Sequence, residues 1–360
     1  MNLQEHIPLA PFTTFHIGGP ARFFILAQTT DEVIQALAFA RERSLPLFVL
    51  GGGSNILVAD NGFDGLVLAV RIPGITSENR DGYASVTAGA GVVWDELVAW
   101  AVRRGFAGFE CLSGIPGTVG GAVIANVGAY GAQCSDTFVS AEALDLHDAN
   151  GVPKVLTKDE CRFTYHDSLF CREPGRYLVV RATFALPTNG APRFAYKDNR
   201  FDLSALATKN GRPPTLANVR NMVLDVREQK GNLIMEDCVS YKGAGSFFHM
   251  PFVSPQQYEH VKSRARALDA EKEERLRPWA WEQPDGSYKL APGFLLEYTE
   301  FQKGHVRGAV GISPKHTLAI INVADARASD VAGLARDMCD AIEKIFGVRL
   351  EREVKYVGFE

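Results

Sequence analysis

The first half of the chain alternates between stretches with helical periodicity and continuous apolar runs. Apolar residues recur on one face of a helix that starts at Thr30, and a second such helix covers Trp94–Arg104 and ends at Gly105. The apolar runs are typical of buried strands. The predicted strands are Leu47–Leu50, Leu66–Val70, Tyr83–Ala88, Ala141–His147 and Tyr177–Leu186. This order of elements predicts an α/β organisation for the first half.

The pattern changes between Pro187 and Thr215, where Asn-Gly and Pro-Pro pairs replace apolar runs. Such residues mark turns and linkers, so we place a domain boundary here. Helices and short strands are mixed beyond it, which predicts an α+β second half. The last helix is expected to be capped by Ser329 and to end at Gly347. The predicted elements are helices at Asn218–Glu228, from Ser254-Pro255 onward and at Ser329–Phe346, and strands at Thr317–Val323 and Val348–Val357.

Composition limits the classes of function. The chain has 360 residues, of which 46% are hydrophobic, and its net charge of −4 does not indicate a nucleic-acid partner. Its six cysteines include no C-x-x-C pair and its histidines show no metal-ligand spacing, so neither a disulfide framework nor a metal site is predicted. No signal segment is evident, and no apolar run approaches the ~20 residues of a membrane span. We therefore expect a cytoplasmic protein that does not insert into membranes.

Glycine is concentrated in two loops. Six glycines fall between Gly114 and Gly131, and Gly51–Gly53 follows the apolar run Leu47–Leu50. Loops with so few side chains let backbone N–H groups approach an anion closely, which suits a pyrophosphate. Together they predict one extended phosphate-bearing ligand, such as a dinucleotide, although each loop alone is more often a tight turn between strands. Neither loop fits G-x-G-x-x-G or a P-loop, so those scaffolds are not indicated.

Three polar residues are candidates for chemistry. Ser246 follows Gly245 and precedes two phenylalanines, so its hydroxyl can meet a ligand where water is excluded. A turn serine bonded to its own backbone gives the same pattern, and the G-x-S-x-G elbow of a hydrolase is absent. Glu353 lies on the polar face of the last predicted strand, either as a rigidly held carboxylate or as a solvated charge. His166, in Tyr165-His166-Asp167, can change its charge near neutral pH.

In combination, these segments resemble the UDP-N-acetylenolpyruvoylglucosamine reductases over nearly the whole chain. Six matches in the family's order are more specific together than any one of them. The matching segments are Gly51-Gly-Gly-Ser-Asn-Ile56, Gly114-Ile-Pro-Gly-Thr-Val-Gly-Gly-Ala122, Asn126-Val-Gly-Ala-Tyr-Gly131, Gly243-Ala-Gly-Ser-Phe-Phe248, Lys289-Leu-Ala-Pro-Gly-Phe-Leu295 and Leu350-Glu-Arg-Glu-Val354.

The resemblance implies an α+β chain with an FAD-binding fold of the vanillyl-alcohol-oxidase (PCMH) type in two α/β subdomains, followed by a C-terminal α+β substrate-binding domain. FAD is expected to bind noncovalently, NADPH to reduce it, and the chain to be a monomer. The domains expected are residues 1–70 and 71–214 for the two FAD-binding subdomains, 215–347 for the substrate-binding domain, and 348–360 for a C-terminal strand that returns to the FAD site.

The same resemblance implies which residues bind ligands. Tyr196, Lys230 and Lys289 are expected to contact the substrate or the NADPH phosphate. The residues expected to bind FAD are Gly51, Gly52, Gly53, Ser54, Asn55, Ser113, Gly114, Ile115, Pro116, Gly117, Gly120, Gly121, Ala122, Asn126 and Gly128.

The implied reaction converts UDP-N-acetylglucosamine enolpyruvate to UDP-N-acetylmuramate, a step of peptidoglycan precursor synthesis. After hydride transfer from the reduced flavin, Ser246 protonates the enolate, and Glu353, with a raised pKa, acts on the same end of the substrate. His166 stands where the family has an arginine that binds the substrate carboxylate. We expect His166 to replace it as an imidazolium, or Arg162 or Arg172 to reach the same position.

Two other functions fit this sequence. One is an FAD-dependent oxidase of the same fold that acts on a sugar or an alcohol. The other is a non-enzymatic flavin-binding regulator that has kept the scaffold. Bleaching of the flavin by NADPH favours the reductase, bleaching by a free sugar favours the oxidase, and a regulator would be unaffected by Ser246→Ala.

Overall fold

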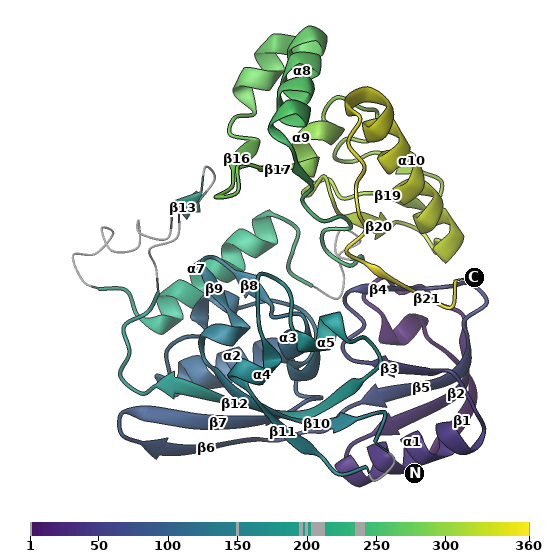
Figure 1. Ribbon diagram of the computed structural model, residues 1–360, viewed down its shortest axis with the longest axis vertical. Coiled ribbons are helices and arrows are strands. Elements are labelled where there is room, and N and C mark those ends of the chain that lie inside the picture. The colour runs from purple at the N-terminus through teal and green to yellow at the C-terminus, as the bar shows by residue number, and fades with distance from the viewer. Residues whose placement is uncertain are drawn as a thin grey trace. The chain divides into compact units, whose positions relative to one another are not determined.

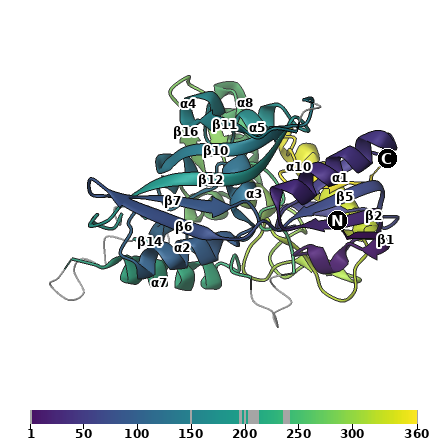
Figure 2. The same ribbon diagram turned by 90° about the horizontal axis from the view of Figure 1, so that it is seen from below.

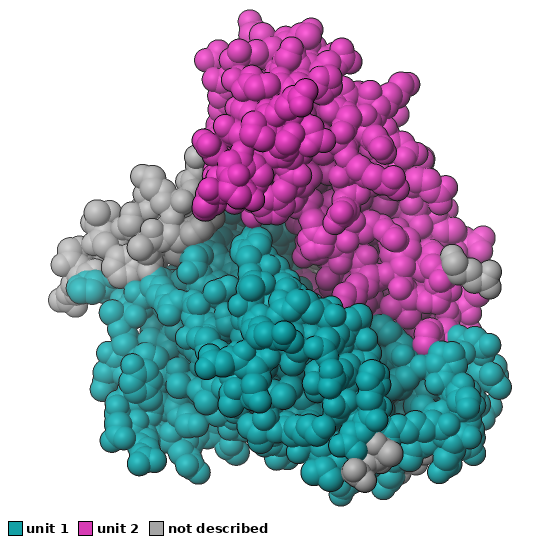
Figure 3. Space-filling view, viewed as in Figure 1, with its two compact units in different colours: residues 1–7, 21–53, 64–233 teal, residues 8–20, 54–63, 234–360 magenta. Residues whose placement is uncertain are grey.

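The computed structural model consists of two compact units (Figure 3). Each unit has its own hydrophobic core. Unit 1 comprises residues 1–7, 21–53 and 64–233, and unit 2 comprises residues 8–20, 54–63 and 234–360. The residues that the structure describes are 2–148, 151–193, 197–198, 201–202, 213–234 and 242–359.

A four-stranded sheet with one covering helix forms part of unit 1 (Figure 2). The helix, α1 (Thr30–Glu42), begins where predicted, because Thr29 and Glu32 cap each other's backbone amides. Strands β3 and β5 run parallel, with Leu47 opposite Leu66. The strand order is β1 (Leu3–Pro8), β2 (Pro20–Ala27), β5 (Phe63–Val70) and β3 (Leu47–Leu50).

A five-stranded antiparallel sheet forms the rest of the unit 1 framework, with α2 (Trp94–Arg103) and α3 (Val119–Ile124) on one side of it (Figure 1). Trp94 is fully buried in the core, where its ring meets those of Phe109 and Phe184 edge-on. The strand order is β11 (Lys154–Thr157), β10 (Phe138–Asp145), β12 (Tyr177–Pro187), β7 (Tyr83–Gly89) and β6 (Ile75–Arg80). Short elements complete the unit: α4 (Lys158–Cys161), α5 (Leu169–Arg172), η2 (Glu110–Leu112), η3 (Cys134–Asp136), and the strand pairs β8 (Gly128–Ala129) with β9 (Ala132–Gln133) and β13 (Lys197–Asp198) with β14 (Phe201–Asp202).

Helix α7 (Leu216–Gln229) belongs to unit 1, which differs from the predicted boundary between residues 214 and 215. Its apolar face, with Val219 and Val223 fully buried, contributes to the same core as Trp94. Composition alone misplaced this helix, because the irregular stretch before it resembles a linker while the helix itself packs back onto unit 1. The units divide after Leu233.

Unit 2 is a mixture of helices and short strands, as predicted for the second half. Its parallel pair, β4 with β21, joins an early segment of the chain to the C-terminus. The strands are β15 (Phe252–Val253), β17 (Tyr288–Leu290) and β16 (Ala280–Glu282) in one sheet, β18 (Val306–Arg307), β19 (Val310–Ile312) and β20 (Ile320–Asn322) in another, and β4 (Ile56–Val58) with β21 (Lys355–Val357). The helices are η1 (Ala10–Phe12), α8 (Pro255–Arg275), α9 (Pro292–Leu296) and α10 (Ala328–Phe346).

Helix α10 ends at Gly347 as predicted, with φ of 65°, but Ser329 is not its N-cap. Instead the carboxylate of Asp60 accepts hydrogen bonds from the backbone amides of Ala328 at 2.6 Å and Ser329 at 3.1 Å. The carboxylate of Asp60, which is distant in the sequence, therefore caps the N-terminus of α10 in place of the hydroxyl of Ser329.

The predicted continuous strand Val348–Val357 is also wrong in extent, since only its last three residues form β21. The preceding residues pair irregularly with a neighbouring segment, through Glu353 N to Phe247 O at 3.0 Å and His249 N to Glu351 O at 2.9 Å. The segment has no regular strand pairing before β21. Its predicted apolar positions Val348, Leu350 and Val354 are nevertheless buried.

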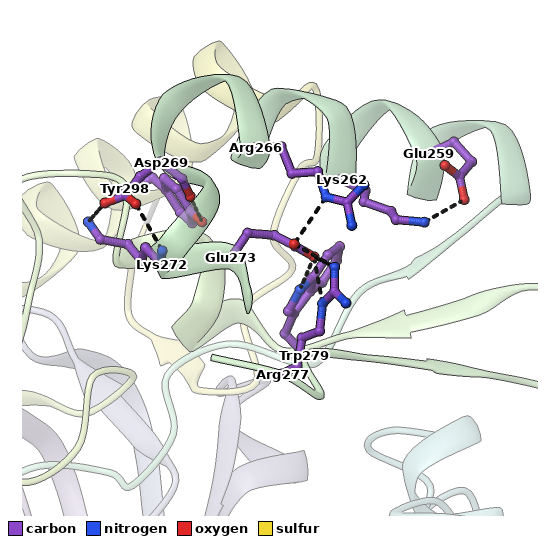
Figure 4. A network of polar contacts seen from close by, with 9 residues as sticks. All are labelled: Glu259, Lys262, Arg266, Asp269, Lys272, Glu273, Arg277, Trp279 and Tyr298. Carbon is purple, nitrogen blue, oxygen red and sulfur yellow. Dashed lines mark hydrogen bonds and ion pairs between the residues drawn. The ribbon is translucent and has the colours of Figure 1, made fainter. Parts of the chain in front are cut away.

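A buried carboxylate organises the end of α8 in unit 2 (Figure 4). Glu273 is only 1% exposed and accepts hydrogen bonds from Arg277 at 2.6 Å, Arg266 at 3.2 Å and the indole N–H of Trp279 at 3.2 Å. Burial alone would raise the pKa of Glu273, but these hydrogen bonds outweigh it and hold the pKa below its ordinary value. The contacts fix the chain that leads from α8 into β16.

Candidate active site

The two glycine loops meet in unit 1. A Cβ atom added to Gly52 would lie 2.4 Å from the Cα of Gly117, and one added to Gly51 would lie 3.2 Å from Thr118 Oγ1. The backbones are therefore in direct contact, and Gly53 and Gly117 have positive φ angles of 66° and 110°. Such a joint loop surface without side chains fits the predicted extended phosphate-bearing ligand.

Several predicted ligand-binding groups in these loops are already used by the protein itself. The amide of Gly114 donates to Asp95 at 2.6 Å, and that of Gly120 donates to the carbonyl of Ala90 at 3.0 Å. The amides of these two glycines therefore stabilise the loop itself, and a bound phosphate would need hydrogen bonds from other backbone amides. Gly121 and Ala122 lie in α3, while Ile115 and Pro116 form the irregular segment before Gly117.

Ser113 and Asn126 support the loops through their side chains. The hydroxyl of buried Ser113 donates to the carbonyl of Glu110 at 2.7 Å. The amide group of Asn126 donates to the carbonyl of Thr164 at 2.7 Å and accepts from the amide of Ser135 at 2.9 Å. A backbone contact of either residue with a cofactor stays a prediction.

Helix α7 anchors the second glycine loop, a role that the sequence did not reveal. Arg220 forms a two-pronged ion pair with Asp95 at 2.6 and 2.7 Å, and Asp95 holds the amide of Gly114. Arg227 donates to the carbonyl of Gly114 at 3.0 Å. Burial opposes ionisation of Asp95, but the hydrogen bonds from Arg220 and Gly114 outweigh it and lower its pKa. Burial also lowers the pKa of Arg227.

His166 and Lys230 both lie beside the loop that begins at Asn126. His166 is exposed on a tight turn with φ of 51°, and a Cβ added to Gly128 would be 3.8 Å from its ring. Lys230, at the end of α7, places its ammonium group 5.5 Å from the ring centre of Tyr130. The structure thus brings these two predicted residues to one loop.

The two arginines weighed as replacements for the family arginine are engaged near His166. Arg162 pairs with Glu173 at 3.4 Å, and Arg172 pairs with Asp167. Arg172 also donates to the carbonyl of Arg162 and so braces the turn. Both guanidinium groups are therefore already paired within the protein.

In unit 2, Ser246 and Glu353 lie on two hydrogen-bonded segments. Gly245, with φ of 71°, turns the chain so that Ser246 is half-buried and Phe247 and Phe248 are fully buried. The amide of Glu353 donates to the carbonyl of Phe247 at 3.0 Å. Within the described part of the chain the Ser246 hydroxyl makes no hydrogen bond, so it is not the self-bonded turn serine considered above.

The carboxyl group of Glu353 lies beside a histidine, His249, to which the sequence did not point. Burial raises its pKa above the ordinary value, and His249, whose Nδ1 lies 3.9 Å from Glu353 Oε2, only partly offsets this rise. Asn55 donates from its side chain to the carbonyl of Glu353 at 3.3 Å and accepts from the amide of Lys355 at 3.1 Å. Asn55 therefore positions the backbone of Glu353, and Ser54 precedes it.

Two residues that were predicted to bind the substrate or NADPH remain, Lys289 and Tyr196. Lys289 lies in the central strand β17, with its ammonium group 5.8 Å from the ring centre of Phe252. Tyr196 lies outside the described residues. Across the described ranges, no cluster of three or more His, Cys, Asp or Glu side chains could hold a metal, and none of the helices has the length and apolar character to cross a membrane.

Comparisons with known proteins identify the family. A family model described as an FAD binding domain matches residues 21–153, and one described as the C-terminal domain of UDP-N-acetylenolpyruvoylglucosamine reductase matches residues 237–357. The reductases of Thermobifida fusca and Pseudomonas aeruginosa are each 37% identical to this chain, over 99% and 98% of it and 98% of their own lengths. The chain belongs to the UDP-N-acetylenolpyruvoylglucosamine reductase family.

A solved structure agrees with this assignment. The crystal structure of the reductase from Thermus caldophilus is 25% identical, with a TM-score of 0.61 over 99% of both chains. The predicted fold class, an FAD-binding fold of the vanillyl-alcohol-oxidase type with a C-terminal α+β domain, is confirmed. As a member of this reductase family, the protein is an oxidoreductase that uses FAD and NADPH, and the oxidase alternative has less support.

Gly52→Ala tests whether the contact between the glycine loops matters for FAD. The added methyl group would collide with the backbone of Gly117, and overpacking of this kind costs about 1–3 kcal/mol. We expect FAD affinity to fall roughly 5- to 150-fold, measured by titrating the apoprotein with FAD. The matched control is Gly333→Ala in α10, where the nearest atom would be 3.5 Å from the new Cβ. Unchanged FAD affinity in Gly52→Ala would contradict the proposed loop function.

Proposed function

We propose that this protein reduces UDP-N-acetylglucosamine enolpyruvate to UDP-N-acetylmuramate, with Ser246 as the proton donor and Glu353 acting on the same end of the substrate. Family membership supports the substrate and the reaction. Two observations carry the residue assignment: the Ser246 hydroxyl bonds to no described residue, and the Glu353 carboxyl has a raised pKa. The two residues lie on segments joined by the hydrogen bond from the Glu353 amide to the Phe247 carbonyl.

The glycine loops would hold the dinucleotide, and their backbone contact supports this assignment. When bound and reduced, FAD would supply a hydride for the alkene carbon of the substrate. The electron pair of the alkene then moves toward the adjacent carboxylate. The protein must stabilise this negative charge and deliver one proton to the neighbouring carbon, because the product is a saturated lactyl ether.

Ser246 suits the delivery of this proton. Its hydroxyl has no protein acceptor among the described residues, so it is available to the substrate. A serine hydroxyl is a weak acid, but an enolate is basic enough to take its proton, and water restores the hydroxyl after turnover. Phe247 and Phe248, both fully buried, support the turn that carries it.

Glu353 suits the stabilisation of the charge. A carboxylate would repel the substrate's own carboxylate, whereas a protonated carboxyl donates a hydrogen bond to it. The burial that raises the pKa of Glu353 favours the protonated form. The half-buried position of this side chain leaves it accessible to a ligand.

Separate half-reactions test the proposal. Under argon, NADPH should bleach the flavin of the purified protein, and the enolpyruvyl sugar nucleotide should then restore the oxidised spectrum with formation of UDP-N-acetylmuramate. Failure of NADPH to bleach the flavin, or failure of this substrate to restore it, would refute the reductase assignment. Bleaching by a free sugar or alcohol alone would favour the oxidase.

His166 is proposed to bind the substrate carboxylate as an imidazolium, in the role of the family arginine. The value of kcat should then fall as pH rises through about 6.5–7.5, the ordinary histidine range. Since arginine stays charged, His166→Arg should raise kcat at about pH 8. The control is His147→Arg, an exposed histidine elsewhere in unit 1. A flat kcat profile for the wild type between about pH 6 and 8.5 would remove His166 from this role.

A further inference from the structure

The side chains of His249 and Glu353 lie within ion-pair distance of each other in unit 2, on segments that backbone contacts hold together. Nδ1 of His249 lies 3.9 Å from Oε2 of Glu353, and both side chains are partly exposed. The two residues lie on paired segments, since Phe248 bridges to Arg352, the amide of His249 donates to Glu351, and the amide of Glu353 donates to Phe247. The imidazole therefore faces the carboxyl because of the backbone arrangement.

Among the described residues, the other charged groups of these segments do not pair with the Glu353 carboxyl. Arg352 places its guanidinium 3.8 Å from the ring centre of Tyr356, and Glu351 and Lys355 are exposed on the same segment. From the facing segment before β4, Asn55 contacts the backbone carbonyl of Glu353 and not its carboxyl group. Among the residues that the structure describes, His249 is the one ionisable group that pairs with this carboxyl.

Resting on the function proposed above, we propose that His249 and Glu353 hold one proton between them and so present an uncharged pair to the substrate carboxylate. The proton can reside on the carboxyl beside a neutral imidazole, or on the imidazole beside a carboxylate. In both forms the pair has no net charge, so it does not repel the anionic substrate or the developing enolate. Glu353 alone would become negative as soon as it lost its proton.

His249 is therefore a positioning residue that acts through Glu353. Histidine changes charge near neutral pH, so it extends the range in which the pair keeps its proton. Without His249, Glu353 becomes negatively charged at a lower pH. The substrate half-reaction should reveal this difference, whereas reduction of the flavin by NADPH should not depend on it.

The test compares pH profiles for reoxidation of the reduced enzyme by UDP-N-acetylglucosamine enolpyruvate. In His249→Gln, the pH above which reoxidation slows should be lower than in the wild type by roughly one unit. At a given pH in this alkaline range, the variant should therefore react about tenfold more slowly. His249→Lys restores a cation beside the carboxyl, so it should recover the rate and raise the pH above which reoxidation slows beyond that of the wild type. The control is His260→Gln, an exposed histidine in α8.

The outcomes separate this inference from the proposed function. If the wild type is reduced by NADPH but is not reoxidised by the enolpyruvyl substrate, the proposed function fails. If the wild type turns over and the profile of His249→Gln coincides with it, the proton-sharing pair is refuted. A profile of His249→Lys that coincides with that of His249→Gln would also refute it, because the cation would then have no effect.

Discussion

Replacing Ser246 with alanine is expected to slow reoxidation of the reduced enzyme by UDP-N-acetylglucosamine enolpyruvate by about 10²–10⁴-fold, the usual contribution of a positioned proton donor. Reduction of the flavin by NADPH should keep the wild-type rate, because that step requires no proton from this hydroxyl. The folded state should be little affected, since within the described ranges the hydroxyl bonds to no other group that would be left unpaired.

Rapid mixing followed by flavin absorbance measures the two half-reactions separately. Ser287→Ala is a matched control, because Ser287 is also a turn serine in unit 2 and its hydroxyl donates to Asp285 at 2.7 Å. Equal loss in both variants would indicate a general effect of removing a turn hydroxyl. Reoxidation of Ser246→Ala at the wild-type rate would exclude Ser246 as the proton donor.

Much of the local structure follows from local signals in the sequence. The strand Leu47–Leu50 is found as predicted, because a short apolar run lies between Pro46 and Gly51. The helix that begins at Trp94 ends within one residue of its predicted end, since Gly105 with φ of 75° stops it. In these cases the deciding residues are neighbours in the sequence.

The features that the sequence did not show depend on residues far apart along the chain. Arg220 pairs with Asp95 across 125 positions, and both belong to unit 1. Asp60 caps α10 across 268 positions, where a local rule favoured Ser329. Neither partner carries a local pattern that points to the other, so charge and periodicity alone could not pair them.

The candidate site likewise contains features that could be predicted from local sequence and one that could not. The meeting of the two glycine loops could be inferred, because one extended ligand needs both of them. The motif that contains Ser246 and the one that contains Glu353 were also recognisable by their residues. His249 was not, because a lone histidine has no spacing that indicates a carboxyl partner; only the pairing of its segment with that of Glu353 brings it there.

Replacing Glu273 with alanine is expected to destabilise unit 2 by about 1–3 kcal/mol, the usual cost of leaving a buried donor, here the indole N–H of Trp279, without its acceptor. The loss is large because this carboxylate accepts from Arg266, Arg277 and Trp279 (Figure 4) and is itself only 1% exposed. Glu273→Gln keeps an acceptor oxygen and should lose less stability than the alanine variant. Denaturant unfolding measures the free energies of unfolding.

The pKa shift of Glu273 adds a pH dependence that a simple cavity would not show. Because its folded-state pKa is lowered, its contribution is present above the ordinary glutamate pKa and is lost as pH falls through the lower folded value. The stability difference between wild type and Glu273→Ala should therefore shrink in acid. The control is Glu259→Ala, which removes an exposed pair with Lys262 and should cost at most about 1 kcal/mol. If Glu273→Ala costs no more than this control, or if its deficit does not change with pH, the buried carboxylate does not hold the end of α8 as inferred.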